Sequence, residues 1–121
     1  MSKHLLVIDD EAPTRELLAL MFRRQGLEVS VADTGRTGML EVERQPFDLV
    51  VLDLDLGDAD GIEMLPQIKK LRPGMPVIIF TGMKTNPALV ESARQKGADG
   101  FMAKNQPLDQ MLKEIRRLLG A

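Results

Sequence analysis

The sequence predicts an α/β fold built on a five-stranded parallel sheet, and two observations carry this prediction. Short apolar runs alternate with amphipathic stretches along the 121 residues, a pattern typical of strands and helices in turn. Two of the runs, Leu49–Leu52 and Val77–Phe80, are apolar at every position, as expected of central strands covered on both faces. Right-handed crossovers then place helices on both faces of a doubly wound (βα)5 sheet, for which we expect the strand order 2-1-3-4-5.

Each predicted strand is a short run of apolar or β-branched residues followed by a polar segment. The five strands are Leu5–Asp9, Glu28–Ala32, Leu49–Asp53, Val77–Thr81 and Gly100–Ala103. No internal repeat, linker or low-complexity stretch interrupts this series. We therefore expect residues 1–121 to form a single domain.

The first two helices are predicted from local start and stop signals. The first runs from about Pro13 to Gln25 and ends at Gly26. Its apolar residues at helical spacing are Leu17, Leu18, Met21 and Phe22. The second helix begins near Thr34, whose hydroxyl can accept a hydrogen bond as an N-cap.

The remaining three helices contain or follow prolines. The third starts just after Gly61 and ends before Arg72, and Pro66 is tolerated if the helix begins late. Asn86-Pro87 opens the fourth helix as N-cap and first residue, and Gly97 closes it. Pro107 opens the fifth helix. The predicted buried stripe of this helix consists of Leu108, Met111, Leu112, Ile115 and Leu119.

The composition excludes several classes of function. No cysteine is present, which excludes a disulfide framework and a cysteine nucleophile and suits a reducing cytosol. His4 is the one histidine, and tryptophan and tyrosine are absent, so histidine bases and aromatic nucleic-acid surfaces lack their residues. With a net charge of −2, no membrane-length apolar run and no visible signal peptide, we expect a cytoplasmic protein without direct nucleic-acid or membrane contacts.

Acidic residues gather at two points of the chain. Residues 1–80 carry 14 acidic and 9 basic side chains, while residues 81–121 carry 4 acidic and 7 basic ones. Seven of the acids lie in two short segments, 9–11 and 53–60. Crowded carboxylates repel one another, and a fold tolerates them most readily when a cation joins them.

Four of the five predicted strands end in a side chain suited to chemistry, namely Asp9-Asp10, Asp53, Thr81 and Lys104. Because the carboxyl ends of parallel strands lie along one edge of the sheet, we expect these groups to share a cleft. Oxygen ligands without histidine or cysteine suit a hard cation, Mg²⁺ above all. The set is suited to phosphoryl transfer, in which Asp53 attacks in line while Mg²⁺ and Lys104 offset the phosphoryl charge.

Four short motifs give the chain a resemblance to a known family. They are Ile8-Asp9-Asp10-Glu11, Leu52-Asp53 with Asp60-Gly61, Phe80-Thr81-Gly82, and Gly97-Ala98-Asp99-Gly100-Phe101 leading to Lys104. Each motif alone is weak, but all four in order at strand ends are highly specific and span essentially the whole chain. The chain resembles the response regulator receiver domain of two-component systems, of the chemotaxis-regulator type. Receiver proteins are a standard example of the flavodoxin-like fold with strand order 2-1-3-4-5, so the resemblance implies that order as well.

The resemblance implies roles for the acids. Asp53 matches the phosphoacceptor and also belongs to the implied metal-binding set. Asp10 matches a direct Mg²⁺ ligand, and Asp9 a neighbour that acts through water. Asp55 matches the position whose backbone carbonyl binds the metal. The implied donor is a phosphohistidine on a sensor histidine kinase or a histidine phosphotransfer protein. The chain would then be a signalling protein that catalyses only its own phosphorylation and dephosphorylation.

The resemblance also implies a switch. Thr81 and Lys104 match the hydroxyl and the lysine that contact the bound phosphoryl group, and Phe101 matches an aromatic that turns inward on phosphorylation. Phe101 is equally compatible with plain packing. The expected surface for an output partner, which the sequence does not identify, is the face of the fourth helix, fifth strand and fifth helix, around Lys84, Phe101 and Lys113.

Two residues depart from the family pattern. Asn105 stands where a proline often follows the lysine, and a cis bond before a non-proline residue costs about 2.5–4 kcal/mol, so we expect a trans Lys104–Asn105 bond and a reshaped loop. Gly57 replaces a common proline after the acceptor strand, which predicts a more mobile loop. The Asp55 and Met83 side chains flank the phosphorylation site and are candidates for setting the lifetime of the phosphoryl group.

Alternative interpretations stay open at this point. A small Mg²⁺-dependent phosphohydrolase resembling the haloacid dehalogenase group shares the Asp53-Leu54-Asp55 pattern, although there the nucleophilic strand comes first. A pseudo-receiver would be a binding module with this fold and no phosphorylation, and the intact acids, Thr81 and Lys104 argue against it. Asp9-Asp10 could simply cap a helix. A calcium loop is excluded, because no frame around Gly61 places the acids correctly.

Overall fold

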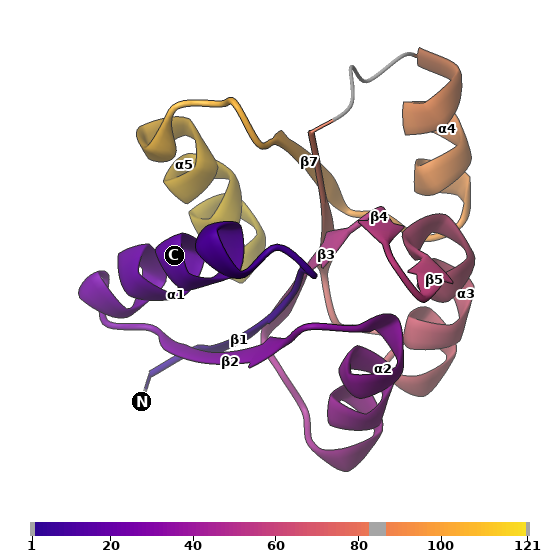
Figure 1. Cartoon of the computed structure of the whole chain (residues 1–121), viewed down its shortest axis with the longest axis horizontal. Helices are drawn as coiled ribbons and strands as arrows, with labels where there is room; N and C mark the ends of the chain where they lie inside the picture. The colour runs from indigo at the N-terminus through magenta and orange to yellow at the C-terminus, as the bar shows by residue number, and fades with distance from the viewer. Residues whose placement is uncertain (1, 83–86, 121) are drawn as a thin grey trace.

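The computed structural model describes residues 2–82 and 87–120 of the chain. Its main sheet has five parallel strands in the order β2-β1-β3-β6-β7 (Figure 1), which is the predicted order 2-1-3-4-5 when the long strands alone are counted. These strands are β1 His4–Ile8, β2 Glu28–Ala32, β3 Leu49–Asp53, β6 Val77–Thr81 and β7 Gly100–Ala103.

Helices cover both faces of this sheet. In Figure 1, α1 and α5 lie on one side, and α2, α3 and α4 lie on the other. Their bounds are α1 Ala12–Arg24, α2 Gly35–Arg44, α3 Gly61–Leu71, α4 Pro87–Gln95 and α5 Leu108–Leu119. Among the described residues, the predicted (βα)5 alternation and the doubly wound arrangement are therefore confirmed.

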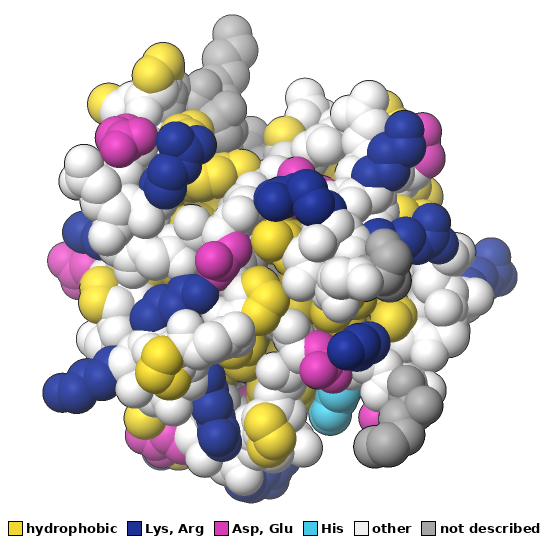
Figure 2. Space-filling view, turned by 180° about the vertical axis from the view of Figure 1, so that it is seen from behind, with side chains coloured by type: hydrophobic (Ala, Val, Ile, Leu, Met, Phe, Trp, Pro, Cys, Tyr) yellow, Lys and Arg dark blue, Asp and Glu magenta, His cyan; other side chains and the backbone are white. Residues whose placement is uncertain are grey.

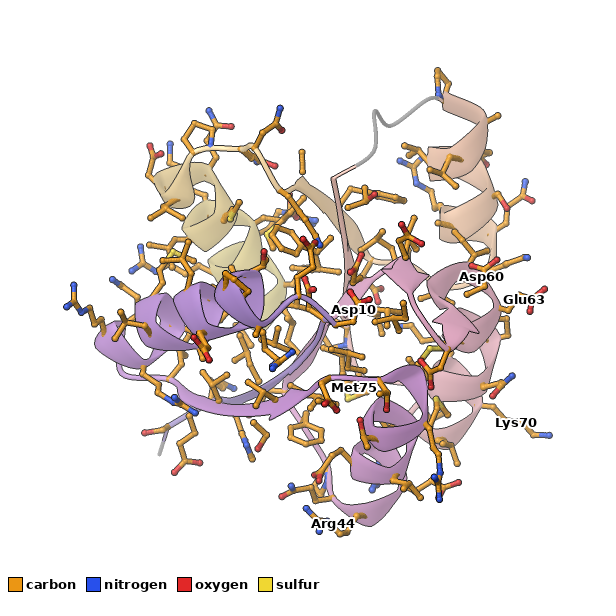
Figure 3. The ribbon with its side chains drawn as sticks, viewed as in Figure 1. Asp10, Arg44, Asp60, Glu63, Lys70 and Met75 are labelled. Atoms are coloured by element: carbon orange, nitrogen blue, oxygen red, sulfur yellow. The ribbon has the colours of Figure 1, made fainter. Side chains whose placement is uncertain are left out.

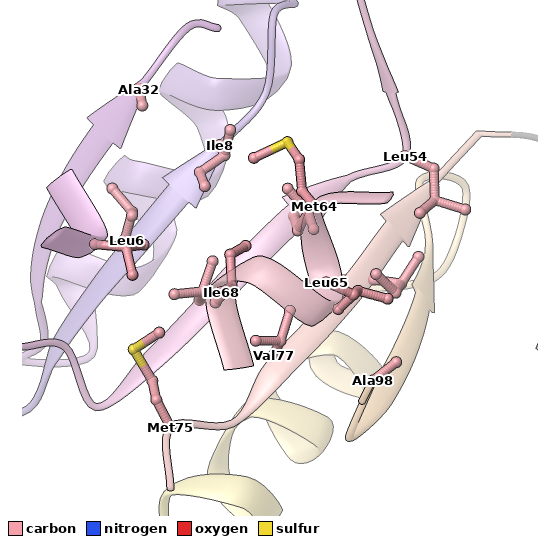
Figure 4. Close-up of a cluster of buried hydrophobic side chains, with 14 of the residues drawn as sticks. Leu6, Ile8, Ala32, Leu54, Met64, Leu65, Ile68, Met75, Val77 and Ala98 are labelled. Atoms are coloured by element: carbon pink, nitrogen blue, oxygen red, sulfur yellow. The ribbon is translucent and has the colours of Figure 1, made fainter. Parts of the chain in front are cut away.

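The alternation of side chains along the strands divides the core into two layers. Leu5 and Val7 of β1 belong to the layer under α1 and α5, together with Phe22. Leu6 and Ile8 belong to the opposite layer, which α3 covers (Figure 4). Each fully buried Leu, Ile or Phe side chain contributes about 1.5–3 kcal/mol, so the two layers hold the strand ends in fixed positions.

Both central strands are buried at every position, as predicted. The first strand differs from the prediction by one residue, since β1 ends at Ile8 and Asp9 begins the loop. The Asp9 N–H still donates to the Ala32 carbonyl at 3.1 Å, so the loop leaves the sheet in a fixed direction. Thr34 caps α2 as expected, and its side-chain oxygen accepts from the Thr37 N–H at 3.0 Å.

Several helix details differ from the sequence predictions. Pro66 lies inside α3, which begins at Gly61, so the idea of a late start was wrong. The ring is exposed while Met64, Leu65 and Ile68 are buried, so packing on the other face of α3 offsets the lost hydrogen bond.

Two leucines assigned to apolar helix faces are exposed. Leu108 is 45% exposed and does not join the buried stripe of α5, which centres on Met111 and Ile115. Leu17 of α1 is 51% exposed. Scattered surface leucines are ordinary, and helical spacing alone does not separate them from core positions. The predicted cap Asn86 lies outside the described residues.

The loop after β3 contains an element that the sequence analysis missed. Two short antiparallel strands, β4 Asp55–Leu56 and β5 Ala59–Asp60, form a hairpin that leads into α3. The Asp60 carboxylate, labelled in Figure 3, caps α3 by accepting from the Ile62 N–H at 2.9 Å. The hairpin therefore links the end of β3 to the start of α3 through ordered structure.

Charged side chains of both signs are interspersed on the side opposite the view of Figure 1 (Figure 2). This mixture agrees with the small net charge of −2. Within residues 2–82 and 87–120, no helix combines the length and the apolar character that a membrane crossing requires.

Candidate functional site

The register of the sheet brings the predicted site residues to one edge. Ile8 of β1 pairs with Leu52 of β3, so Asp9 and Asp53, the next residue in each chain segment, are neighbours. Asp53 pairs in turn with Phe80, and Thr81 pairs with Ala103 of β7. The carboxyl ends of the strands therefore meet as the sequence predicted.

These residues surround an open cleft of about 320 Å³. Its lining residues are Asp10, Glu11, Asp53, Asp55, Thr81, Gly82 and Lys104. Figure 3 shows Asp10 where β1 gives way to the start of α1. The floor is buried, since Asp53 is 2% exposed and Thr81 is 1% exposed, whereas Asp10 and Glu11 at the rim are exposed.

Four carboxylates lie close enough to share one cation. One oxygen from each of Asp9, Asp10, Glu11 and Asp53 lies within 4.8 Å of the others. An all-oxygen set of this kind matches the preference of Mg²⁺ and Ca²⁺. The acidic cluster can therefore hold a hard metal ion.

One atom of the cluster supports this reading. Asp9 Oδ1 accepts from the Glu11 N–H at 2.9 Å, but the buried Oδ2 accepts no hydrogen bond from the described part of the chain. The Lys104 ammonium, 3.2 Å away, is near enough for ionic attraction but does not form a hydrogen bond with good geometry. Buried carboxylate oxygens without a donor are costly, and a metal ion or its bound water would supply the missing partner.

Lys104, which directly follows β7, offsets the negative charge of the acids. Its Nζ lies 2.6 Å from Glu11 Oε1 and 3.2 Å from Asp53 Oδ2, and it stands 5.7 Å above the Phe80 ring. Burial alone would lower the pKa of Lys104, but the hydrogen bond to Glu11 and the charges of Asp53 and Asp9 together raise it above its ordinary value. The lysine therefore stays charged at any physiological pH.

The surroundings of Asp53, in contrast, favour its neutral form. Burial, with a further contribution from the charge of Asp9, raises the pKa of Asp53 to about 6, against hydrogen bonds from the Asp55 N–H and Lys104. A cation placed among the carboxylates would favour the ionised form of Asp53. Positive charge in the cleft would therefore favour the carboxylate form, which is the form able to act as a nucleophile.

The backbone around Asp53 is tightly folded. The Asp55 N–H donates to Asp53 Oδ1 at 3.1 Å, and the Gly61 N–H donates to the Leu54 carbonyl at 3.0 Å. A Cβ at Gly61 would lie 2.6 Å from the Asp53 carbonyl oxygen, a backbone atom that cannot move aside. Only glycine permits this approach of the two backbone segments.

The other predicted site residues have mixed outcomes. The Asp55 side chain is exposed at the cleft, and Phe101 is half-buried against the core layer that includes Ile79. This contact agrees with plain packing, and a switch role for Phe101 stays a prediction. Met83 and Lys84 lie outside the described residues. No peptide bond among the described residues is cis, so Lys104–Asn105 is trans as expected.

Glu11 is the site residue that the sequence analysis left without a role. It is the N-cap position of α1, yet its side chain makes no capping hydrogen bond and pairs with Lys104 instead. Asp9 Oδ1 accepts from the N–H of Glu11, just before α1, while Asp9 Oδ2 faces Lys104, so capping alone does not describe these acids. The run of three acids at 9–11 was the signal that could have identified Glu11.

Comparisons with known proteins agree with this geometry. The family model described as response regulator receiver domain matches residues 5–116. The transcriptional regulatory protein GlrR of Escherichia coli is 36% identical over 112 residues, which cover 93% of this chain and 25% of GlrR. The chain thus spans about a quarter of the length of this regulator.

Solved structures similar to this chain belong to the same family. A CheY-like receiver domain protein from Methanospirillum hungatei superposes with a TM-score of 0.94 at 29% identity, covering 99% of this chain and 95% of that one. A response regulator from Burkholderia pseudomallei, solved with a phosphorylated aspartic acid, a calcium ion and citrate, has a TM-score of 0.88 at 25% identity, covering 98% and 69%. The chain therefore belongs to the response regulator receiver domain family of two-component systems.

Proposed function

We propose that this receiver domain takes up a phosphoryl group on Asp53 while Asp9, Asp10, Asp53 and the Asp55 backbone carbonyl hold Mg²⁺. One observation carries the proposal. The buried Asp53 carboxylate lies 3.2 Å from the Lys104 ammonium and belongs to a cluster of acids whose oxygens lie within 4.8 Å of one another. A nucleophile, a fixed positive charge and a metal-binding cluster are the parts that phosphoryl transfer requires.

The proposed reaction is an in-line transfer from phosphohistidine. A carboxylate oxygen of Asp53 forms a bond to phosphorus as the phosphorus–nitrogen bond breaks, and the electron pair of that bond leaves with the imidazole. Lys104 would offset the charge on the phosphoryl oxygens, and Thr81, which lines the same cleft, would contact one of them. The metal, when bound, supplies further positive charge to the same oxygens.

The Burkholderia relative supports the choice of residue type, because that structure holds both a phosphorylated aspartic acid and a calcium ion. A sensor histidine kinase or histidine phosphotransfer protein is the donor we propose. Residues 1–121 would act as a single receiver domain that turns over no external substrate beyond its own phosphorylation and dephosphorylation. The cytoplasmic location stays a prediction.

Phosphorylation would also act as the switch. The phosphoryl group adds negative charge and acceptor oxygens beside Thr81 and Lys104, which would shift an existing equilibrium of conformations. Because Lys104 follows β7 directly and Phe101 lies within β7, the face formed by α4, β7 and α5 is where we propose that the change is read.

Intact mass after incubation with Mg²⁺ and a small phosphoryl donor tests the proposal. We expect the parent chain to gain one phosphoryl group and Asp53→Asn to gain none, because the amide is a poor nucleophile. Asp55→Asn is the matched control, since it changes an exposed carboxylate at the same cleft and leaves the backbone carbonyl in place. It should still be phosphorylated.

The alternative functions give different results. Sustained release of phosphate from small phosphomonoesters that depends on the Asp55 side chain would favour the phosphohydrolase. A parent chain that binds Mg²⁺ but gains no mass with any phosphoryl donor would make this a pseudo-receiver.

A further inference from the structure

The tip of the β4–β5 hairpin is joined to the beginning of α2 by one carboxylate. Asp58 Oδ1 accepts from the Gly35 N–H at 2.8 Å, and Asp58 Oδ2 accepts from the Arg36 N–H at 3.1 Å. These two bonds lower the pKa of Asp58 below its ordinary value, and the bond from Gly35 has the larger effect. The carboxylate is therefore charged at neutral pH. Figure 1 shows the hairpin beside the starts of α2 and α3.

The join completes the amino end of α2. The first four N–H groups of a helix have no partner within it. Here the Thr37 N–H donates to the Thr34 hydroxyl and the Thr34 N–H donates to the Thr37 hydroxyl, while the Gly35 and Arg36 N–H groups donate to Asp58. Thr34 and Thr37 thus bind two of the four groups at the helix end itself, and Asp58 binds the other two from a segment 22 to 23 residues away.

The approach of the two segments is close enough to require a glycine. A Cβ at Gly35 would lie 2.6 Å from Ala59 Cβ and 3.1 Å from Met64 Sδ. A larger residue there would clash with Ala59 and displace the hairpin that carries it. The contact is therefore built from two independent features, a paired carboxylate and a residue with no side chain.

The same hairpin carries the backbone of Asp55 to the cleft. Asp55 pairs with Asp60 and Leu56 pairs with Ala59, so the hairpin is only two residue pairs long. Its open end is fixed by the Gly61–Leu54 hydrogen bond and its tip by Asp58. A short ladder held at both ends has little freedom left in the middle.

We infer that Asp58 is a positioning residue for the cation site: its carboxylate anchors the hairpin to α2 and so holds the Asp55 backbone carbonyl where the metal needs it. The inference rests on the proposed function, which gives that carbonyl its role. It follows by reciprocity that a cation in the cleft stabilises the start of α2 through the same anchor.

Calorimetric titration with Mg²⁺ tests the anchor, using the parent chain, Asp58→Ala, Asp58→Asn and Thr34→Ala. We expect Asp58→Ala to weaken Mg²⁺ binding about tenfold, the lower end for groups that orient a metal ligand. Asp58→Asn keeps one acceptor oxygen and should bind within about threefold of the parent. Thr34→Ala removes a cap from the same helix end without touching the hairpin, so it should lower the melting temperature and leave Mg²⁺ affinity unchanged.

Amide hydrogen exchange supplies a second readout that simple destabilisation would not change. Mg²⁺ should slow exchange at Gly35 and Arg36 in the parent and in Thr34→Ala, but not in Asp58→Ala. Equal Mg²⁺ affinity in Asp58→Ala and the parent would overturn the inference and leave the proposed function intact.

Equal weakening in Asp58→Asn and Asp58→Ala would also overturn it, because the loss would then follow the charge and not the anchor. A parent chain that binds no Mg²⁺ at all would overturn both the inference and the metal in the proposed function.

Discussion

The two edges of the central sheet differ in how their charged side chains are paired. At the amino edge, the Lys69 ammonium lies 2.5 Å from Asp99 Oδ2 and donates to the Met75 carbonyl at 2.8 Å. The same Asp99 oxygen accepts from the Val77 N–H at 2.9 Å, where β6 begins. One positive charge meets one negative charge, and the strand start is bound by both.

At the carboxyl edge the balance is different. Lys104 is the ammonium that faces Asp9, Glu11 and Asp53, and Asp9 Oδ2 is left without a donor among the described residues. Desolvation raises the pKa of Asp53, so the folded state is penalised when that group ionises. The difference indicates that the amino edge stabilises the fold, while the carboxyl edge keeps an unfavourable cluster of the kind found at functional sites, here the proposed cation and phosphoryl site.

Addition of Mg²⁺ should give the largest effect on this comparison. At one hundred times its dissociation constant, a ligand that binds only the folded state adds about 2.7 kcal/mol to the free energy of unfolding. We expect that gain for the parent and a much smaller one for Asp53→Asn, measured by urea unfolding followed by circular dichroism. Equal gains in both chains would show that the cation binds somewhere other than the carboxyl edge.

Asp99→Ala should have the next largest effect, and at the amino edge alone. It leaves the Val77 N–H and the Lys69 ammonium without their partner, which should lower the free energy of unfolding by about 2 kcal/mol. Asp99→Asn retains an acceptor for Val77 and should lose roughly half as much. Mg²⁺ affinity should be unchanged in both, and a weaker Mg²⁺ site would show that the two edges are not independent.

The contrast between the edges also explains what could be predicted from the sequence. The strand runs Leu49–Leu52 and Val77–Phe80 are apolar throughout, and the rule that parallel strands end on one edge then placed Asp53 and Thr81 together. The same rule placed Asp9 and Lys104 there. It depends on chain order alone, so a local pattern was sufficient.

Features that depend on contacts between distant segments could not be predicted in this way. The β4–β5 hairpin has two-residue strands, which are too short to show a period in the sequence. Asp58 finds its partners on α2, and Glu11 finds Lys104 across 93 residues. Leu108 and Pro66 were misjudged for the same reason, because their surroundings are set by which helix face meets the sheet.

A third prediction is that a substitution in the buried site stabilises the fold, whereas most substitutions at buried positions destabilise it. Without metal at pH 7, Asp53→Asn should raise the free energy of unfolding by about 1 to 2 kcal/mol, because it removes a charge whose pKa is raised to about 6. The gain is smaller than that shift implies, since the cleft is open to solvent. For a carboxyl with a raised pKa, the penalty is absent below the unfolded value of 3.8 and complete above about 6.

Urea unfolding at pH 3.5 and at pH 7.5, without metal, checks this sign. The two chains should differ in stability at pH 7.5 and converge at pH 3.5. A mutant less stable than the parent at pH 7.5 would mean that the hydrogen bonds to Asp53 outweigh its desolvation.

Glu11→Gln should produce the smallest effect, and it decides what the fourth carboxylate of the cluster does. The Glu11 side chain is exposed, and its hydrogen bond with Lys104, 2.6 Å long, lowers the pKa of Glu11. Exposed pairs of this kind contribute little, so the melting temperature should hardly change. If Glu11 serves Lys104 and not the cation, the substitution should weaken Mg²⁺ binding by less than about threefold, against more than about tenfold for Asp10→Asn. Equal losses for Glu11→Gln and Asp10→Asn in the same titration would make Glu11 a metal ligand, and Lys104 would then have to release it whenever the cation binds.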